Sequence, residues 1–179
     1  MEASLKEHRG RVADIRINKA DTQAVSASYD GSCIIWDIKS HTRVMCLFES
    51  TMFKQIVYHP DESQLLTTGS NRKITYWDCF DGQAIRMLDG SETGEINALA
   101  ISKEGNHFVS GGEDKRIKVW DYDEGICYYN GVGHSGTISK VRNITNLNLM
   151  FHNIDRDVTR SKVHRECGLR RRNLHLAHP

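Results

Sequence analysis

Three Trp-Asp pairs recur along the 179-residue chain at nearly constant spacing. They begin at Trp36, Trp77 and Trp120, so that the tryptophans lie 41 and 43 residues apart. One such pair arises easily by chance, whereas a step of about 40 to 45 residues with one pair per unit is typical of four-stranded propeller blades. The repeat therefore predicts an all-β fold built from similar units that stack on one another.

The local pattern is the same in all three units when they are aligned on their tryptophans. A short strand is followed by a polar turn and a second strand that ends in Trp-Asp, as in VSASYDGSCIIWD, LTTGSNRKITYWD and VSGGEDKRIKVWD. Alternation is clear at 116–120, where every second side chain is apolar. The turns at 30–31, 71–72 and 114–115 favour two-residue hairpins.

The other two strands of each unit are expected on either side of this central hairpin. Alternating polarity and polar turns place the first strands at 12–17, 54–58 and 95–101. The fourth strands are expected at 44–48, 84–88 and 126–129. Helix signals are nearly absent, so we expect four antiparallel strands in every unit.

These patterns predict a partial WD-repeat β-propeller as the fold class. Three antiparallel blades are expected at about 1–48, 49–89 and 90–131. A fourth unit is expected to begin with its first strand at 132–142, because GHSGTI at 133–138 parallels the start of the first unit. No tryptophan follows Trp120, and 143–179 is expected to be a basic, irregular tail.

The first unit contains a histidine, a serine and an aspartate that invite comparison with a nucleophilic triad. The spacing favours a structural network, since His8 lies 22 residues before Asp30 and Trp36 lies six residues after it. These intervals resemble the tetrad of WD-repeat propellers, in which the histidine links the turn aspartate to a serine and the tryptophan indole. We therefore expect His8, Ser26, Asp30 and Trp36 to form a buried structural network.

The other two units keep only part of this set. The second has a glutamate, Glu49, near the histidine position, and the third has Glu92 there. The partial tetrads are expected at Thr67, Asn71 and Trp77 and at Ser110, Asp114 and Trp120. Without the histidine, both units are expected to be held mainly by apolar burial.

Composition argues against most kinds of chemistry. The net charge of +1 provides no global field for nucleic acid or anionic lipid. The five cysteines are scattered without a CxxC pair, which predicts reduced thiols in an intracellular protein and no zinc site. No apolar run approaches the roughly 20 residues that span a bilayer. We expect no enzyme, cofactor, metal site, small-molecule substrate or membrane partner, and nucleic acid is disfavoured.

The tail at 143–179 departs from the repeat and allows two interpretations. Its basic residues, including the run at 170–172, could form an arm for an acidic tubulin surface, for RNA or for nuclear import. The alternative is an unrelated C-terminus without a selected role. We favour the second interpretation, because short basic tracts are a weak signal and Phe151 is the one aromatic residue in the tail.

Residues outside the Trp-Asp motif narrow the comparison with known families. They occur in YDGSCIIWD at 29–37, in YHPDESQLLTTGSNRKITYWDCFDGQAIRMLDGS at 58–91 and in GGEDKRIKVWDYDEGICYYNGVGHSGTISKVR at 111–142. Together with the linking segments they resemble the C-terminal blades of the WD-repeat cilia- and flagella-associated proteins found inside axonemal doublet microtubules. The resemblance covers roughly residues 5 to 142, and the tail diverges from it.

The resemblance implies a non-enzymatic microtubule inner protein of motile cilia and flagella, within the cytoplasm and its cytoskeleton. Its implied partners are tubulin in the doublet wall and other axonemal inner proteins, and its implied role is to stabilise the doublet. No binding residue carries over, because the matching motif residues are structural. The repeat alone leaves a soluble WD-repeat adaptor as the alternative, since one fold hosts many functions.

Three blades and one strand are too few to close a ring, which typically needs four to eight blades. We therefore expect either a fragment or isoform of a longer propeller, or open ends that another chain covers.

Overall fold

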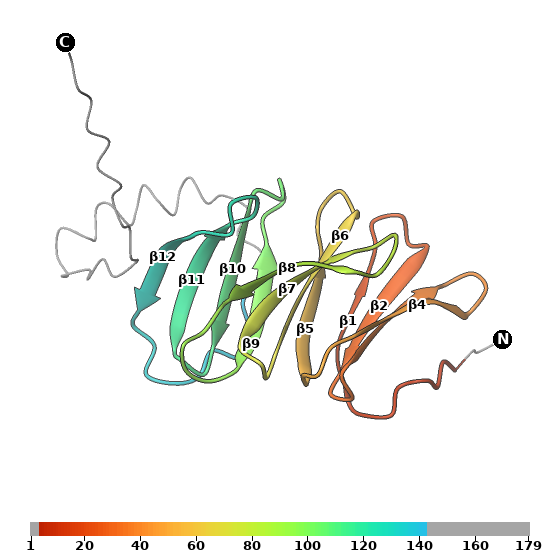
Figure 1. The fold of residues 1–179 in the computed structure, drawn as a ribbon, viewed down its shortest axis with the longest axis horizontal. Coiled ribbons are helices and arrows are strands. Elements are labelled where there is room, and N and C mark those ends of the chain that lie inside the picture. Colours follow the sequence, from red (N-terminus) through yellow and green to blue (C-terminus); the bar gives the residue numbers. More distant parts are fainter. Residues whose placement is uncertain (1–3, 143–179) are drawn as a thin grey trace, which may run out of the picture. The chain divides into compact units, whose positions relative to one another are not determined.

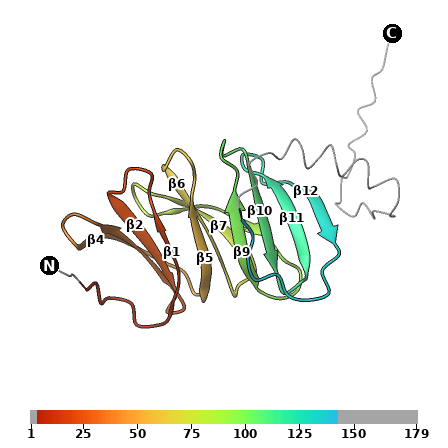
Figure 2. The same ribbon diagram turned by 180° about the vertical axis from the view of Figure 1, so that it is seen from behind.

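The structure is a computed structural model in which residues 4–142 are described. Within that range the chain forms twelve β-strands and no helix. Each of three antiparallel sheets contains four strands that are consecutive in the sequence (Figures 1 and 2). We call these sheets blade 1, blade 2 and blade 3. The all-β, WD-repeat propeller architecture predicted from the repeat is confirmed.

The strands of each blade pair in sequence order, from the first strand to the fourth. Blade 1 contains β1 (Val12–Ile17), β2 (Gln23–Ser28), β3 (Ser32–Asp37) and β4 (Thr42–Phe48). Blade 2 contains β5 (Phe53–Tyr58), β6 (Gln64–Gly69), β7 (Lys73–Asp78) and β8 (Ala84–Asp89). Blade 3 contains β9 (Ile96–Ile101), β10 (His107–Gly112), β11 (Arg116–Asp121) and β12 (Cys127–Val132).

A bulge shifts the register between the third and fourth strands of every blade. In blade 3 the pairs Val119↔Tyr129 and Trp120↔Cys127 leave Tyr128 as the extra residue. The fourth strand of blade 3 also differs from the predicted 126–129. It begins at Cys127 instead of Ile126 and runs on to Val132.

The hairpins between the second and third strands are one residue longer than predicted. In blade 2 the amide of Arg72 donates to the carbonyl of Gly69, and Arg72 itself has a positive φ of 64°. Lys115 and Gly31 follow the same pattern, with φ values of 61° and 85°. A turn followed by one left-handed residue is the usual three-residue hairpin loop, and glycine adopts that conformation without steric cost.

The start of a fourth unit is only partly as expected. No strand occurs at 133–142, so the predicted first strand is absent from this described segment. The segment still reaches blade 3, because the Ile138 amide donates to the Gly112 carbonyl at 2.9 Å and the Ile138 side chain is buried. A first strand pairs with the second strand of its own blade, and that partner would fall after Arg142, outside the described residues.

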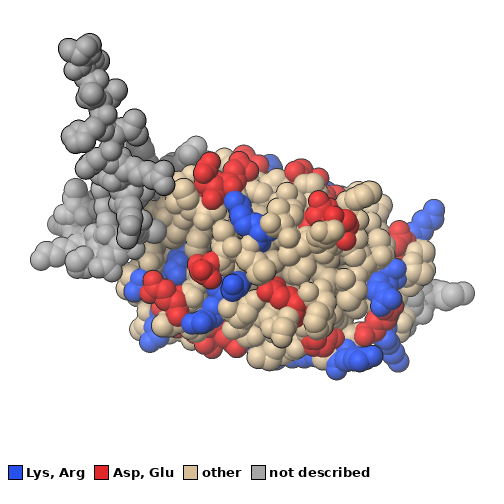
Figure 3. Space-filling view, viewed as in Figure 1, with Lys and Arg blue, Asp and Glu red and all other residues tan. Residues whose placement is uncertain are grey.

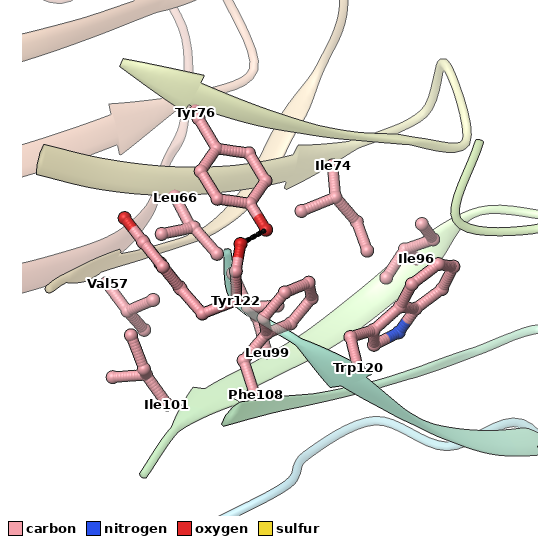
Figure 4. Close-up of a cluster of buried hydrophobic side chains, with 10 residues drawn as sticks. All are labelled: Val57, Leu66, Ile74, Tyr76, Ile96, Leu99, Ile101, Phe108, Trp120 and Tyr122. Carbon is pink, nitrogen blue, oxygen red and sulfur yellow. Dashed lines mark hydrogen bonds between the residues drawn. The ribbon is translucent and has the colours of Figure 1, made fainter. Parts of the chain in front are cut away.

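Apolar side chains fill the space between consecutive blades. One cluster joins blades 1 and 2 and includes Val25, Leu47, Phe53 and Trp77. The other joins blades 2 and 3, and Figure 4 shows the Tyr76 hydroxyl reaching the Tyr122 carbonyl across it, at 3.1 Å. Each fully buried large side chain contributes about 1.5–3 kcal/mol. The blades are therefore held mainly by burial against their neighbours.

Polar contacts at the first strands link each blade to the next one. The Gln55 side chain accepts a hydrogen bond from the Leu99 amide at 2.6 Å, which links β5 to β9. Lys54 pairs with Glu95 at 2.7 Å between the same blades. The Arg16 guanidinium donates to the Ile56 carbonyl at 3.2 Å, which links β1 to β5.

Candidate functional site

The predicted tetrad residues of blade 1 lie within hydrogen-bonding distance of one another. His8 approaches Asp30 Oδ2 through Nδ1 at 3.2 Å and Ser26 Oγ through Nε2 at 2.6 Å. The Trp36 indole donates to the same Ser26 hydroxyl at 2.8 Å. The serine and tryptophan are buried at 5% and 6% exposure, and the histidine side chain is 8% exposed. A connected polar chain thus runs from the turn aspartate into the blade.

The order Ser26–His8–Asp30 matches that of a nucleophilic triad, so accessibility decides what it can do. The Ser26 hydroxyl is enclosed in the blade and already accepts the indole hydrogen of Trp36. A cavity of about 830 Å³ opens at the carboxyl ends of β1, β5 and β9, and no member of the network lines it. The Ser26 hydroxyl is thus a buried link between the His8 ring and the Trp36 indole.

Asp30 is held as a carboxylate by the chain around it. Burial works against ionisation, but Ser32 donates from both its hydroxyl and its amide, at 2.5 and 2.9 Å. The amides of Arg9 and Gly10 donate to the other oxygen. These hydrogen bonds outweigh burial and lower the pKa of Asp30 well below its usual value. The same bonds fix the N-terminal segment to the β2–β3 turn.

Blade 2 contains a different polar set at the equivalent place. The Glu49 carboxylate accepts from Asn71 Nδ2 at 2.6 Å and from the Thr75 hydroxyl at 3.2 Å. The Trp77 indole donates to Thr67 at 2.8 Å. Glu49 therefore takes over the link between the turn and the segment before the first strand. Blade 2 therefore has a polar link in place of the histidine, in addition to the apolar burial that was expected to hold it.

Blade 3 contains a buried lysine instead of a histidine. Lys118 Nζ lies 3.3 Å from Asp114 Oδ2 and donates to the Gly90 carbonyl at 2.7 Å. The Lys118 and Asp114 side chains are only 11% and 8% exposed. The Ser91 hydroxyl also donates to Asp114, at 3.2 Å. This ion pair joins the β10–β11 turn to the segment before β9.

Alignment of the three units predicted the wrong residue in place of the histidine of blade 3. Glu92, predicted near that position, is exposed, and its backbone carbonyl accepts a hydrogen bond from Arg72 at 2.8 Å. Ser110 and Trp120 do form the predicted pair, with 2.9 Å between the indole nitrogen and the hydroxyl. Lys118 was not predicted as a buried partner, because its place in the alternation at 116–120 indicates an exposed polar side chain. Its spacing of four residues from the turn aspartate, Asp114, is the sequence feature that could have indicated the ion pair.

Two of the described cysteine thiols lie in surroundings that lower their reactivity. Burial raises the pKa of the Cys33 thiol, and burial followed by nearby carboxylates raises that of Cys79 to about 12. Both thiols are thereby kept in the protonated form, which is a poor nucleophile. Residues 4–142 contain no cluster of three or more metal-binding side chains. That same range has no helix that could cross a membrane.

Comparison with known proteins identifies the repeat and close relatives. The family model described as WD domain, G-beta repeat matches residues 1–37 and 82–121. Proteins named Cilia- and flagella-associated protein 52 from Chlamydomonas reinhardtii and Homo sapiens are 56% and 48% identical, over 141 and 142 residues. The human Pre-mRNA-processing factor 17 is more distant, at 31% identity over 119 residues.

Solved structures agree on the fold. The structure titled "Structure of U3-55K" matches with a TM-score of 0.74 and 18% identity, and the match covers 79% of this chain and 45% of that one. The WD40 repeats of RRP9 match with the same TM-score and identity. At this identity the likeness concerns the fold alone.

The alignments cover most of this chain but less than a quarter of the ciliary relatives. Each of the two ciliary relatives aligns with 79% of this chain, which spans 23% of their length. The chain is thus a WD-repeat protein, homologous over most of its length to the proteins named Cilia- and flagella-associated protein 52.

Proposed function

We propose that this chain acts as a non-enzymatic scaffold in motile cilia and flagella, bound to the wall of doublet microtubules and to neighbouring axonemal proteins. The observation that carries the proposal is the identity of 56% and 48% to relatives whose names place them in cilia and flagella. Both matches extend well beyond the Trp-Asp motif, which WD-repeat proteins of many functions share.

The architecture supports a role as a rigid platform. Each blade is fixed internally by a polar network and externally by an apolar cluster shared with its neighbour. We propose that the networks at His8, Glu49 and Lys118 are structural. A rigid array presents its loops and outer strands in fixed positions, so that many weak contacts add up along a repetitive lattice.

The charge distribution fits short-range binding to a defined surface. Figure 3 shows lysine and arginine side chains lying among aspartate and glutamate side chains, with uncharged areas between them. The net charge of +1 supports no long-range attraction to one sign of partner. Contacts of this kind select a partner by complementary shape and local charge pairs.

Expression of the tagged full chain in multiciliated cells tests the proposal. The tagged chain should remain on axonemes after detergent extraction of the membrane and soluble proteins. The matching region of the human relative, carrying the same tag, is the positive control, and the tag alone is the negative control. The chain should also co-sediment with purified doublet microtubules.

The soluble adaptor remains the competing function and predicts a different result. An adaptor would give a diffuse cytosolic signal that detergent removes, while the matching human region stays on the axoneme. That outcome, together with no sedimentation on doublets, would overturn the ciliary scaffold for this chain. Recovery of a stable cytosolic complex from the extract would then favour the adaptor.

A further inference from the structure

A cavity of about 830 Å³ lies where the first strands of all three blades end. Its lining comes from the ends of these strands and the residues that follow them, at 16–19, 57–60 and 99–103, and from 140–142. Volumes of this size are usual for ligand pockets. The cavity is separate from the buried networks of the blades and takes no part in them.

The charged groups of the lining are mostly cationic. One carboxylate, Glu62, faces five cations, namely Arg16, Lys19, Lys103, Lys140 and Arg142. The chain itself occupies the first two cations, because Arg16 binds Asp14 and the Ile56 carbonyl, and Lys19 binds the Pro60 carbonyl. Glu62 is also occupied, by the Lys19 amide and the Asn18 side chain.

Three cations of the lining remain available to a ligand. Lys103, Lys140 and Arg142 are exposed, and within the described chain they form none of the ion pairs. They come from two segments that meet at the cavity, the β9–β10 loop and 140–142. Three positive charges that have no ion pair within residues 4–142 and surround one cavity favour an anionic ligand.

The floor of the cavity is aliphatic. Its apolar lining residues are Ile17, Val57, Leu99, Ala100, Ile101 and Val141. Ile17 is 57% exposed, so that a ligand side chain could cover it and gain free energy by burial. A ligand that fits both features combines negative charge with an aliphatic group.

The aromatic residues of the lining are not free to stack on a base. The His59 ring lies against Tyr122, with 4.4 Å between ring centroids, and its Nδ1 lies 2.6 Å from Asp61. Tyr58 packs against the apolar cluster of blades 1 and 2, and its hydroxyl is buried. Single-stranded nucleic acids need stacking platforms as well as cations. The lining therefore favours a peptide over a nucleic acid.

We propose that this cavity is a docking site for an acidic peptide segment of a partner protein. Carboxylates of the segment pair with Lys103, Lys140 and Arg142, while one aliphatic side chain rests on the floor beside Ile17. The proposal stands independently of the ciliary role, because it rests on the lining of the cavity alone.

Fluorescence anisotropy with the purified full chain tests the site. The probe is a labelled peptide in which glutamates flank a single leucine, and the same peptide with lysines for glutamates is the charge control. Lys103→Glu combined with Lys140→Glu should weaken binding about tenfold at low salt, since each change replaces an attraction by a repulsion. Lys6→Glu combined with Lys39→Glu makes the same change in net charge at exposed sites outside the lining and should leave affinity unchanged.

A variant of the floor separates the two parts of the site. Ile17→Ser should weaken the leucine peptide about threefold and leave an all-glutamate peptide unaffected. If either lysine-to-glutamate pair lowers the melting temperature, the corresponding glutamine pair replaces it, and Lys103→Gln with Lys140→Gln must still weaken binding.

Three outcomes would overturn the proposal. One is an affinity that the Lys103 and Lys140 changes leave intact. Another is an equal loss in the Lys6 and Lys39 control, which would indicate general attraction by charge. The third is a single-stranded oligonucleotide that binds more tightly than the acidic peptide and displaces it.

Discussion

Blades 1 and 3 make the same connection with different side chains. In blade 1 the partner of the turn aspartate is the histidine of the segment before the first strand, His8, which reaches Asp30. In blade 3 it is Lys118, inside the third strand, which reaches Asp114 and the carbonyl of Gly90. Both arrangements tie the hairpin turn to the segment that leads into the first strand. The repeated element is thus a link between two segments, and several side chains can form it.

Blade 2 extends the comparison, because it reverses the polarity of the link. The segment before β5 supplies the acceptor, Glu49, and the turn supplies the donor, Asn71. The indole bond to a second-strand hydroxyl is common to all three blades, at 2.8, 2.8 and 2.9 Å. The interior hydroxyl is therefore fixed by the tryptophan, while the outer partner varies in charge.

The largest effect is expected from breaking the link of blade 3. Lys118→Ala leaves the Asp114 carboxylate, 8% exposed, without its cation. Removing one partner of a buried ion pair typically costs 3–5 kcal/mol, and we expect a loss of about 3 kcal/mol because Ser91 still donates to Asp114. Chemical denaturation of the full chain, followed by tryptophan fluorescence, measures the loss.

A paired variant shows whether the unpaired charge is the cause. Lys118→Met with Asp114→Asn removes both charges at similar volume and should recover most of the stability lost in Lys118→Met alone. Lys39→Ala is the matched control on an exposed lysine, with an expected change within about 0.5 kcal/mol. A loss in Lys118→Ala no larger than in Lys39→Ala would show that the pair is not a link.

The sequence predicted this architecture better than it predicted the networks. The Trp-Asp period and the alternation at 116–120 are local patterns, and β11 (Arg116–Asp121) lies where they place it. Burial of Lys118 depends on the second face of the sheet, which another blade covers, and no local pattern records that. The three-residue loops were missed for a related reason, since Arg72 and Lys115 occupy left-handed positions where glycine is the usual signal.

Removing the outer partner in blades 1 and 2 should have smaller effects. His8→Ala takes away the group that joins Ser26 to Asp30, and we expect a loss of about 2 kcal/mol from buried partners left unpaired. Glu49→Ala should cost about 1 kcal/mol, because Glu49 is only half-buried and water can reach its partners. Melting curves and denaturant midpoints of the two variants measure the difference.

The order of these two losses is the critical result. A larger loss for Glu49→Ala than for His8→Ala would mean that the reversed link of blade 2 is the stronger one. Unchanged melting in His8→Ala would show that the blade 1 network contributes nothing to stability. Arg9→Ala provides a control for disturbance of the N-terminal segment, since the contact of Arg9 with Asp30 is made by its backbone amide.

An effect as small as that of Glu49→Ala, and visible only as the pH falls, should come from converting the turn residue of blade 1 into that of blade 2. Asp30→Asn keeps the shape of the side chain and introduces the residue type found at position 71. The pKa of Asp30 is lowered in the folded chain because hydrogen bonds from Ser32, Arg9 and Gly10 outweigh burial. Such a carboxyl stabilises the fold above its unfolded pKa of about 4, and this contribution falls as the pH drops below that value.

Replacing Asp30 by asparagine should therefore reduce the sensitivity of the fold to acid. The free energy of unfolding should fall between pH 5 and pH 3 by about 1 kcal/mol less in Asp30→Asn than in the parent chain. Asp89→Asn, on a side chain that is 94% exposed, should keep most of the parent's acid dependence. Denaturant titrations of all three proteins at both pH values make the measurement. If the free energy of unfolding falls equally in Asp30→Asn and in the parent chain, the carboxylates that make the fold sensitive to acid lie outside the link of blade 1. The three links would then not differ in their response to pH.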